Sequence, residues 1–510
     1  MLQIQNLSIV QKKDHRVLVD DLSFVLNDGE KAALIGEEGN GKSTILKWIH
    51  DPGSVTPYAE VTGICRTRDV IGYLPQELTE PDRALPVTDY LERTCGLSTL
   101  VPKLVQRTAK QLGVDPELLW ADRRMESLSG GERVKVQLAS LLLRECDLLL
   151  LDEPSNDIDL ETLEWLERFL QRTEKTVLFV SHDEVLLERT ARMILHIEQV
   201  RRKTIPRATV ARMPYRQYHD ERERRMAHQA QVSVFEHAEF RRKKERYLSI
   251  YQSVEHAQNS ISRRDPSTGR LLKKKMHTVQ ALGHRLEKEQ ESLTEPPEAE
   301  WAILPKFAPG ISVKNGKTVL DLDLPALTVG ERVLAEHVRL NVTGPERICI
   351  IGQNGCGKST LLKRIGKELL PRKDLSVGYM PQTYGDLLDE RETAITFLAP
   401  NGDKESVTQA RIYLGSMKYT TDEMEHPVRE LSGGQRAKLL LLKMILDENN
   451  VLLLDEPTRN FSPLSNPAVR ELLRSFGGAI IAVTHDRKFL DEVATKVYRL
   501  THDGLMIENR

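Results

Sequence analysis

The sequence lacks any long apolar segment. Its most apolar stretch spans residues 138–151 and is interrupted by charged side chains: Arg144, Glu145 and Asp147. A helix that crosses a bilayer needs about 20 apolar residues, so no membrane partner is expected. The N-terminal residues MLQIQNLSIVQKKD contain no basic leader, apolar run and small-residue cleavage site. We therefore expect a cytoplasmic protein.

Cysteine is scarce as well, with five residues in a chain of 510 and no C-x-x-C pair. This excludes the usual ligand spacings of zinc ribbons and iron–sulfur clusters, and reduced thiols are expected. The fractions of hydrophobic residues (40%) and charged residues (29%) are those of a globular chain, and the length suggests two to four domains. The net charge of only −2, taken alone, argues against a nucleic-acid partner.

The two halves of the chain repeat five motifs in one order. The distance between repeated motifs is 316 residues at Lys42 and Lys358, 306 at Gln76 and Gln382, and 303 from the glycine-rich motif onward. Loop deletions in one of two homologous domains explain the 13-residue shortening. The pairs are GEEGNGKST and GQNGCGKST, YLPQ and YMPQ, LSGGE and LSGGQ, LLLLDEP and VLLLDEP, VSHD and VTHD.

Each half begins its motifs with G-x-x-x-x-G-K-S, at residues 36–43 and 352–359, directly after an apolar run. Such a loop wraps phosphates with its amides and the following helix N-terminus, whereas a plain glycine turn before a helix is the bland alternative. Lys42 and Lys358 would reach the β- and γ-phosphates of ATP. The expected ATP-binding residues are Gly36, Gly39, Asn40, Gly41, Lys42, Ser43, Thr44 and Gln76, with Gly352, Gly355, Cys356, Gly357, Lys358, Ser359, Thr360 and Gln382.

Two further apolar runs in each half end at an Asp-Glu pair and just before a histidine, which predicts a parallel α/β sheet. The aspartates and P-loop serines suit Mg²⁺, a hard cation. The glutamates suit a general base and the histidines a contact to the γ-phosphate. The expected metal ligands are Ser43, Gln76, Asp152, Ser359, Gln382 and Asp455, and the expected catalytic residues are Glu153, Glu456, His182 and His485.

LSGG-[EQ] before a helix, at residues 128–132 and 431–435, closely resembles the signature of the ATP-binding cassette superfamily. The resemblance implies that each signature binds the γ-phosphate held by the opposite cassette, through glycine amides and a helix N-terminus. Two composite sites follow. In one site the second signature, Ser432, Gly433 and Gly434, would be faced by Lys42, Glu153 and His182. In the other site the first signature, Ser129, Gly130 and Gly131, would be faced by Lys358, Glu456 and His485.

The two halves also differ. After the catalytic glutamate the first reads PSNDID and the second PTRNFS, which places Ser462 opposite Asp159 and predicts unequal sites. Cys356 stands where the first loop has Asn40, and a packing role is expected, although alkylation would block the site. No aromatic stands where cassettes stack adenine. His15 is the candidate, with an ordinary surface loop as the alternative.

The segment between the halves is strongly basic. Residues 201–290 contain 22 Lys and Arg against 10 Asp and Glu, a net +12 that leaves −14 for the remainder. Residues 218–261 and 271–290 read as helices, with a turn at Pro266 and Gly269 and a longer arm of about 60 Å. A solvated coiled coil that only spaces two domains is the alternative. Interleaved tyrosine favours RNA contact through Arg241, Arg242, Lys243, Lys244, Arg263, Arg264, Arg270, Lys273, Lys274 and Lys275.

Tandem cassettes with a basic helical linker resemble the ABC-F family of ribosome-associated ATPases over the whole chain. TRNFSPLS at 458–465 and SRRDPSTGRLLKKKM at 262–276 are similar to its bacterial antibiotic-resistance branch. The resemblance implies a fold of two P-loop cassettes, residues 1–200 and 301–510, joined by an α-helical hairpin, residues 201–300, with its tip near 258–272.

The same resemblance implies ATP and Mg²⁺ as ligands and ATP hydrolysis as the reaction. It also implies that a monomer with an intramolecular cassette sandwich binds the exit site of the bacterial 70S ribosome, without DNA. The linker would contact large-subunit rRNA and peptidyl-site tRNA at the peptidyl-transferase centre and displace lincosamides, pleuromutilins or streptogramins A. A housekeeping translation factor stays open as an alternative. An importer ATPase is disfavoured, because its linker should be short and uncharged, whereas about 100 residues separate the cassettes here. A DNA-repair ATPase should have a far longer coiled coil or zinc-binding cysteines, and a ribosome-recycling enzyme should have an N-terminal iron–sulfur cysteine cluster.

Overall fold

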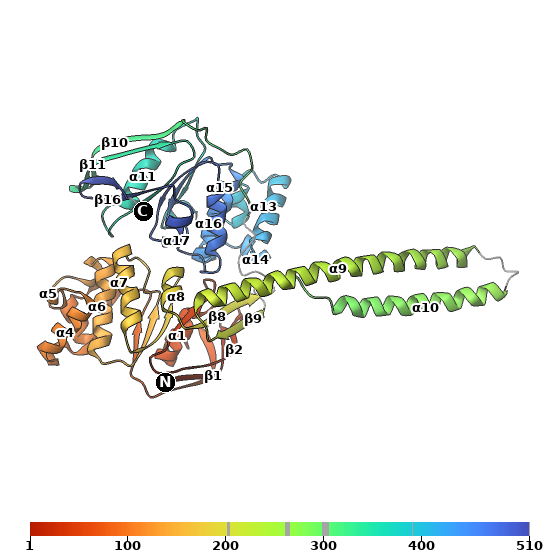
Figure 1. Ribbon diagram of the computed structural model, residues 1–510, viewed down its shortest axis with the longest axis horizontal. Helices are drawn as coiled ribbons and strands as arrows, with labels where there is room; N and C mark the ends of the chain where they lie inside the picture. The colour runs from red at the N-terminus through yellow and green to blue at the C-terminus, as the bar shows by residue number, and fades with distance from the viewer. Residues whose placement is uncertain (201–204, 261–265, 298–304, 390, 509–510) are drawn as a thin grey trace. The chain divides into compact units, whose positions relative to one another are not determined.

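The computed structural model describes residues 1–200, 205–260, 266–297, 305–389 and 391–508. The chain forms two compact units, one of residues 1–216 and 300–510, the other of residues 217–299. The first unit holds both cassettes (Figure 1). None of the described helices has a stretch long and apolar enough to cross a lipid bilayer.

The first cassette contains two sheets. A three-stranded antiparallel sheet has the order β2-β1-β4, with β1 Leu2–Gln11, β2 Val17–Leu26 and β4 Ala59–Thr67. A six-stranded sheet has the order β5-β6-β7-β3-β8-β9, and all its pairs are parallel except β8 with β9. Its strands are β3 Lys31–Ile35, β5 Ile71–Leu74, β6 Leu148–Asp152, β7 Thr176–Val180, β8 Met193–Val200 and β9 Ile205–Ala211.

Helices connect these strands and deliver the motifs to the carboxyl edge of the sheet. The P-loop precedes α1 Lys42–His50, and the glycine-rich signature begins α6 Gly130–Leu143. The other helices of this cassette are α2 Glu80–Ala84, α3 Val87–Cys95, α4 Pro102–Leu112, α5 Pro116–Leu119, α7 Leu160–Arg172 and α8 Glu184–Thr190, with 3-10 turns η1 Pro52–Ser54, η2 Leu97–Thr99 and η3 Met125–Ser127.

The second cassette repeats the order of the first six-stranded sheet as β13-β14-β15-β12-β16-β17, again with one antiparallel edge pair. The predicted parallel α/β class is therefore confirmed in both halves. The strands are β12 Arg347–Ile351, β13 Val377–Met380, β14 Val451–Asp455, β15 Ala479–Val483, β16 Lys496–Thr501 and β17 Gly504–Ile507. The central strands β6, β7, β14 and β15 are buried along their whole length, as their apolar sequences require.

The antiparallel sheet of the second cassette is smaller. It contains β10 Thr318–Val329 and β11 Arg332–Thr343, and the described residues include no counterpart of β4. The ten residues lost between the repeated lysine and glutamine fall in this segment, so most of the shortening is one missing edge strand. The helices are α11 Lys358–Leu369, α12 Ala394–Leu398, α13 Lys404–Ser416, α14 Thr421–Glu425, α15 Gly433–Leu446, α16 Asn466–Arg474 and α17 Arg487–Glu492, with η4 Tyr384–Asp386 and η5 Val428–Glu430.

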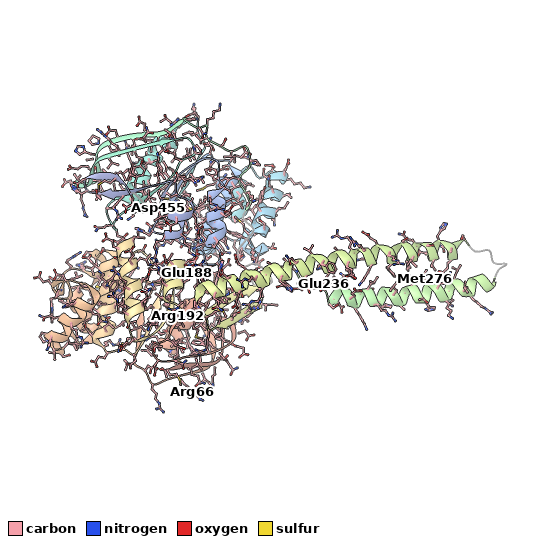
Figure 2. The ribbon with its side chains drawn as sticks, in the orientation of Figure 1. Arg66, Glu188, Arg192, Glu236, Met276 and Asp455 are labelled. Carbon is pink, nitrogen blue, oxygen red and sulfur yellow. The ribbon has the colours of Figure 1, made fainter. Side chains whose placement is uncertain are left out.

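The second unit is a helical hairpin of α9 Tyr215–Asn259 and α10 Pro266–Glu291, which lie side by side (Figure 1). Lys243 pairs with Glu289 at 2.6 Å and Glu236, labelled in Figure 2, accepts from the Thr294 amide at 2.8 Å, so the chains run antiparallel. At ~1.5 Å per residue, the 45 residues of α9 extend roughly 68 Å. The apolar side chains buried along the hairpin include Phe240, Leu272, Val279 and Leu286.

Two sequence expectations need correction here. A turn at Pro266 and Gly269 was expected, but both lie in the first turn of α10. Proline fits there because the first helical amides have no partner inside the helix. The predicted cassette boundary at residue 200 also falls before β9, which pairs with β8 from Ile205 to Ala211. The three-part division at residues 200 and 300 otherwise stays a prediction.

Candidate nucleotide sites

The two P-loops share one backbone conformation. Gly36, Gly39 and Gly41 have φ of +147°, +80° and +89°, and the matching glycines of the second loop have +155°, +79° and +103°. L residues with a side chain rarely adopt these angles. The lysine Nζ atoms donate to carbonyls of their own loops, from Lys42 to Gly36 and from Lys358 to Gly352, both at 2.9 Å. The two loops thus have the same conformation, and in each of them the glycines and the lysine of the loop itself hold it.

A serine hydroxyl meets a strand-end carboxylate beside each loop. Ser43 Oγ donates to Asp152 Oδ1 at 3.0 Å, and Asp152 Oδ2 also accepts from Tyr73 at 3.1 Å. Ser359 likewise hydrogen-bonds Asp455. Burial, and after it the negative charge of the adjacent Glu153, raises the pKa of Asp152 to about 6. Hydroxyl and carboxylate oxygens at this position fit Mg²⁺, which prefers few protein oxygens.

Both predicted catalytic glutamates follow their strands in a left-handed conformation, with φ of +53° at Glu153 and +51° at Glu456. Their partners differ. Glu153 Oε1 lies 2.7 Å from His182 Nε2; burial raises the pKa of Glu153, but His182 and Lys42 outweigh burial and the pKa falls. Glu456 Oε1 lies 3.8 Å from His485 Nε2, and burial and Asp455 raise its pKa to about 7.

The histidines differ in the same way. His182 Nδ1 lies 2.6 Å from the carbonyl oxygen of Phe461 in the other cassette. His485 Nδ1 is buried and has no hydrogen-bond partner among the described residues. Burial and Lys358 lower the pKa of His485 to about 4, so its ring is neutral at physiological pH. The His182 ring is therefore bonded to the other cassette, whereas Nδ1 of His485 makes no such contact among the described residues.

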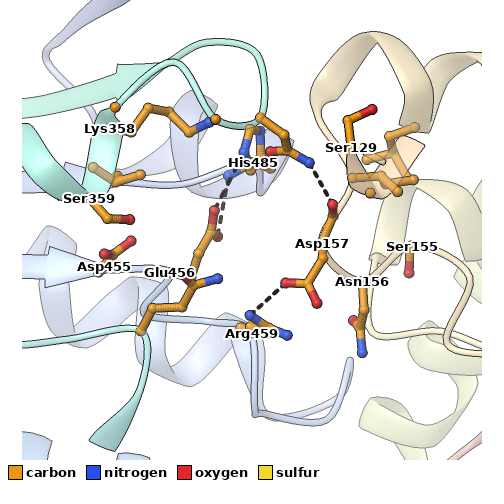
Figure 3. Close-up of a pocket in the computed structure, with 18 of the residues that line it drawn as sticks. Ser129, Ser155, Asn156, Asp157, Lys358, Ser359, Asp455, Glu456, Arg459 and His485 are labelled. Atoms are coloured by element: carbon orange, nitrogen blue, oxygen red, sulfur yellow. Dashed lines mark hydrogen bonds and ion pairs between the residues drawn. The ribbon is translucent and has the colours of Figure 1, made fainter. Parts of the chain in front are cut away.

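A cavity of about 890 Å³ opens at the second P-loop, between the cassettes (Figure 3). Its volume lies at the upper end of the range for ligand pockets. Residues of the second cassette line one side of this cavity and the first signature lines the other: Lys358, Ser359, Gln382, Asp455, Glu456 and His485 against Ser129 and Gly130. Gly131 is not among the lining residues.

Loops of both cassettes also touch at this cavity. Asn354 Nδ2, in the P-loop, donates to the Asp157 carbonyl at 2.5 Å. Arg459 Nη1, after Glu456, lies 2.9 Å from Asp157 Oδ1 (Figure 3). Both contacts join a loop of the second cassette to the loop that follows Glu153 in the first. Arg459 stands at the position of Asn156 in the first half, so the charge of this contact is particular to the second cassette.

The first P-loop meets the second signature differently. A cavity of about 400 Å³ is lined by Ser432 and Gly434 together with Glu37, Glu38 and Gly39. Lys42, Glu153 and His182, which were expected to face this signature, are not among its lining residues. Glu38 Oε2 instead accepts from the Gly434 amide at 2.5 Å. Ser462 is buried and contacts Ser465, whereas Asp159 in its place in the other loop caps α7 by accepting from Thr162.

Each signature serine caps its own helix. Ser129 and Glu132 form a capping box on α6, and Ser432 and Gln435 form one on α15. The glycines permit close packing: a Cβ on Gly130 would lie 1.8 Å from the Asp157 carbonyl oxygen. No side chain fits there, because the backbone of the loop after the Asp-Glu pair packs directly against the signature glycine.

One pair of arginines at these cavities was not predicted from the sequence. Arg16 lines the first cavity and Arg332 the second, and both begin a repeated RVL at the 316-residue offset. Leu334 lines the second cavity as well. His15, the candidate for stacking adenine, is exposed and does not line the first cavity. The short RVL repeat was the signal available in the sequence.

The remaining predicted residues stand as follows. Gln76 is exposed and does not line the first cavity. Cys356 is partly buried, and burial raises the pKa of its thiol. On the hairpin, residues 241–244 and 273–275 are described, whereas Arg263 and Arg264 lie outside the described residues.

A second contact between the cassettes lies away from the nucleotide motifs. Cations of α16 and α17 pair with acids of the first cassette, and the central pair, Arg470 with Glu184, is only 3% and 5% exposed, at 2.5 Å. Lys488 contacts Glu184 at 3.0 Å and Glu188, labelled in Figure 2, at 2.6 Å. Arg487 contacts Glu167 and Asp183 at 2.7 and 2.8 Å. These ion pairs connect the two cassettes independently of a nucleotide.

Comparison with known proteins agrees with this geometry. The family model described as ABC transporter matches twice, at residues 19–156 and 335–459. The chain is 30% identical to the probable ATP-binding protein YheS of Escherichia coli K12, over 97% of this chain and 78% of that protein. It is 29% identical to the tylosin resistance ATP-binding protein TlrC of Streptomyces fradiae, over 94% of each.

Among solved structures, the archaeal ribosome recycling factor aABCE1, determined in complex with the ribosomal stalk protein aP1, has a TM-score of 0.58. It is 18% identical, over 98% of this chain and 90% of that one. At this identity the likeness concerns the fold, which is the same arrangement of tandem cassettes.

Proposed function

We propose a function from the premise that this chain belongs to the ABC transporter family and, within it, to the ABC-F proteins. The chain is an ATP hydrolase with two cassettes. Its function, as we infer it, is to bind the bacterial ribosome in its ATP-bound form and to act there through the helical hairpin.

ATP at the second site would lie in the cavity that Lys358 and Ser129 line. The amides before α11 and Lys358 would hold the phosphates, and the first signature would take up the γ-phosphate from the other side. Arg332 and Leu334, together with Val329, would form the wall for the nucleoside. The same roles in the first site fall to Lys42 and the second signature.

Mg²⁺, when bound, supplies charge neutralisation to the phosphates. Ser359, Gln382 and Asp455 would hold it at the second site, and Ser43, Gln76 and Asp152 at the first. Glu456 and Glu153 would each orient and deprotonate the attacking water, and His485 and His182 would contact the γ-phosphate. Once the γ-phosphate is removed, the contact that it makes between P-loop and signature is lost, so hydrolysis would weaken the sandwich within one monomer.

The observation that carries the ribosome proposal is the hairpin itself. Its helices present exposed cations at Arg241, Arg242 and Lys244, and residues 215–291 contain 17 Lys and Arg against 11 Asp and Glu, a net charge of +6. Tyr247 and Tyr251 lie among them, with ring centroids 6.1 Å apart. Cations with interspersed aromatics suit phosphate contact and base stacking. A spacer between two domains would need neither feature.

In this proposal the protein enters the ribosomal exit site, and the hairpin reaches peptidyl-site tRNA and the rRNA of the peptidyl-transferase centre. Its effect would be protection from lincosamides, pleuromutilins or streptogramins A. Similarity to a tylosin resistance protein over 94% of the chain supports this direction. The second candidate is a housekeeping translation factor, supported by the similarity to YheS. An importer subunit is disfavoured, because its linker would be short and uncharged.

The test uses Glu153→Gln with Glu456→Gln, which should slow hydrolysis and hold ATP in the closed state. We expect this variant to co-sediment with 70S ribosomes in ATP, and the wild type to do so more weakly. A variant that binds ATP but not ribosomes would overturn the proposal. Drug susceptibility of cells that express the wild type, measured for the three drug classes and tylosin, then separates resistance from housekeeping, since a housekeeping factor changes none of them.

A further inference from the structure

The first P-loop carries two carboxylates where the second carries two amides. Glu37 and Glu38 stand at the positions of Gln353 and Asn354, at the same offset of 316 residues as the P-loop lysines. A loop that binds a polyphosphate gains nothing from these two side chains, because an ionised carboxylate cannot donate a hydrogen bond to a phosphate oxygen. Their contacts therefore indicate another role.

Both carboxylates reach across to α15 of the second cassette. Glu38 Oε2 accepts from the Gly434 amide at 2.5 Å, in the first turn of the helix. Glu37 Oε1 lies 3.0 Å from Lys438 Nζ, with the two side chains 20% and 10% exposed. A carboxylate at this end of a helix is stabilised by the free amides, as a phosphate would be.

The matching positions at the second site behave differently. Asn354 donates to the Asp157 carbonyl and carries no charge. Lys135, which occupies on α6 the place of Lys438 on α15, lies 4.9 Å from the centre of the Trp165 ring. The second P-loop thus leaves the first signature available in the larger cavity, where Ser129 and Gly130 are lining residues.

We propose that Glu38 is an internal substitute for the γ-phosphate. It binds the signature amide of Gly434 and, with the pair of Glu37 and Lys438, holds the first site closed without nucleotide. The amide hydrogen of Gly434 cannot be donated fully to Glu38 and to a γ-phosphate at once, so Glu38 must leave before ATP joins the two cassettes there. This inference rests on the proposed function, in which each signature binds the γ-phosphate of the opposite site.

The consequence is a discrimination between nucleotides. Glu38 opposes only the third phosphate, so it lowers the affinity of the first site for ATP and leaves that for ADP unchanged. The second site, with Asn354, keeps its preference for ATP. Closure that depends on ATP then occurs at the second site, while at the first site the contacts of Glu37 and Glu38 hold the two cassettes together.

The test measures nucleotide affinity at one site at a time in the full chain, by calorimetry with Mg²⁺ and either ATPγS, a slowly hydrolysed ATP analogue, or ADP. With Lys358→Ala removing the second site, Glu38→Asn should tighten ATPγS binding about tenfold, the effect of one charge-assisted hydrogen bond. ADP affinity should stay the same. The reverse change, Asn354→Glu with Lys42→Ala, should weaken ATPγS at the second site by a similar factor and spare ADP.

Equal ATPγS affinity with and without Glu38→Asn, or equal shifts for ATPγS and ADP, would overturn the inference. The chain with Lys42→Ala alone separates this result from a failure of the proposed function. If that chain binds no ATPγS although its second site is intact, the assignment of the ATP sites is wrong. Thermal unfolding of every variant identifies any that fail to fold, and Glu38→Gln, which keeps the side-chain length, then replaces Glu38→Asn.

Discussion

At the scale of single residues, two glutamates with the same backbone strain stand in different surroundings. Glu153 and Glu456 share a left-handed φ, which costs about 1 kcal/mol or more and is tolerated where a site requires it. Glu153 is paired with His182 at 2.7 Å, whereas Glu456 lines a cavity with room for a nucleotide. Equivalent motifs therefore do not imply equivalent turnover.

We expect Glu456→Gln to lower kcat for ATP hydrolysis by about 100-fold, the usual effect of losing a general base. Glu153→Gln should lower it by about threefold or less, because Glu38 disfavours ATP at that site. Steady-state phosphate release measures both, with Ser129→Ala as a variant that should resemble Glu456→Gln by damaging the same site. Equal losses for the two glutamates would contradict the asymmetry.

At the scale of elements, the cassettes are joined by ion pairs between helices as well as at the nucleotide motifs. Arg470 on α16 contacts Glu184 at the start of α8, and also Glu492 at 2.8 Å. Both partners in the central pair are almost fully buried, so each charge depends on the other. Burial lowers the pKa of Arg470, but the three surrounding carboxylates outweigh burial and raise it, which keeps the guanidinium charged.

Arg470→Leu should lower the free energy of unfolding by about 3 kcal/mol, because it leaves Glu184 buried with less compensation. Adding Glu184→Leu should restore part of the loss, since two apolar side chains need no partner. Urea unfolding of the two single variants and the double variant measures the coupling. Additive losses in the double variant would show that the pair is not coupled.

At the scale of the whole molecule, basic charge is concentrated in the hairpin and in the residues just before it. Residues 201–290 carry +12 and the remainder −14, and residues 215–291, from the start of α9 to the end of α10, account for +6. Within the hairpin not all cations are equally available. Lys243 is paired with Glu239 at 3.1 Å and Glu289 at 2.6 Å, whereas the neighbouring Lys244 is exposed.

We expect Lys244→Ala to weaken ribosome binding and to reduce the slope of log affinity against log salt by about 0.7, the value for one lost phosphate contact. Lys243→Ala, its matched control, should change the slope less, because its ammonium is already neutralised by carboxylates. Binding to 70S ribosomes between low and high salt measures both slopes. A larger effect of Lys243→Ala would contradict this assignment of the RNA contacts.

The extent to which the sequence anticipated the fold depends on the range of the contacts involved. Strand ends at Asp152 and Asp455, and helix starts after Gly41 and Gly357, follow from apolar runs and glycine loops. The start of α10 at Pro266 was misread as a turn, because proline both ends and begins helices. RVL at Arg16 and Arg332 was overlooked, because three residues are too few to stand out as a repeat.

The sequence by itself determined the two cassettes, their motifs and the basic hairpin, because glycine φ angles, apolar strands and charge are local properties that each segment carries alone. It also showed that the halves differ. Only the tertiary structure decided how they differ, since the contacts of Glu38 with Gly434 and of Arg470 with Glu184 join residues hundreds of positions apart. Such pairs depend on which loop of one cassette meets which helix of the other, and a motif spacing contains no information on that.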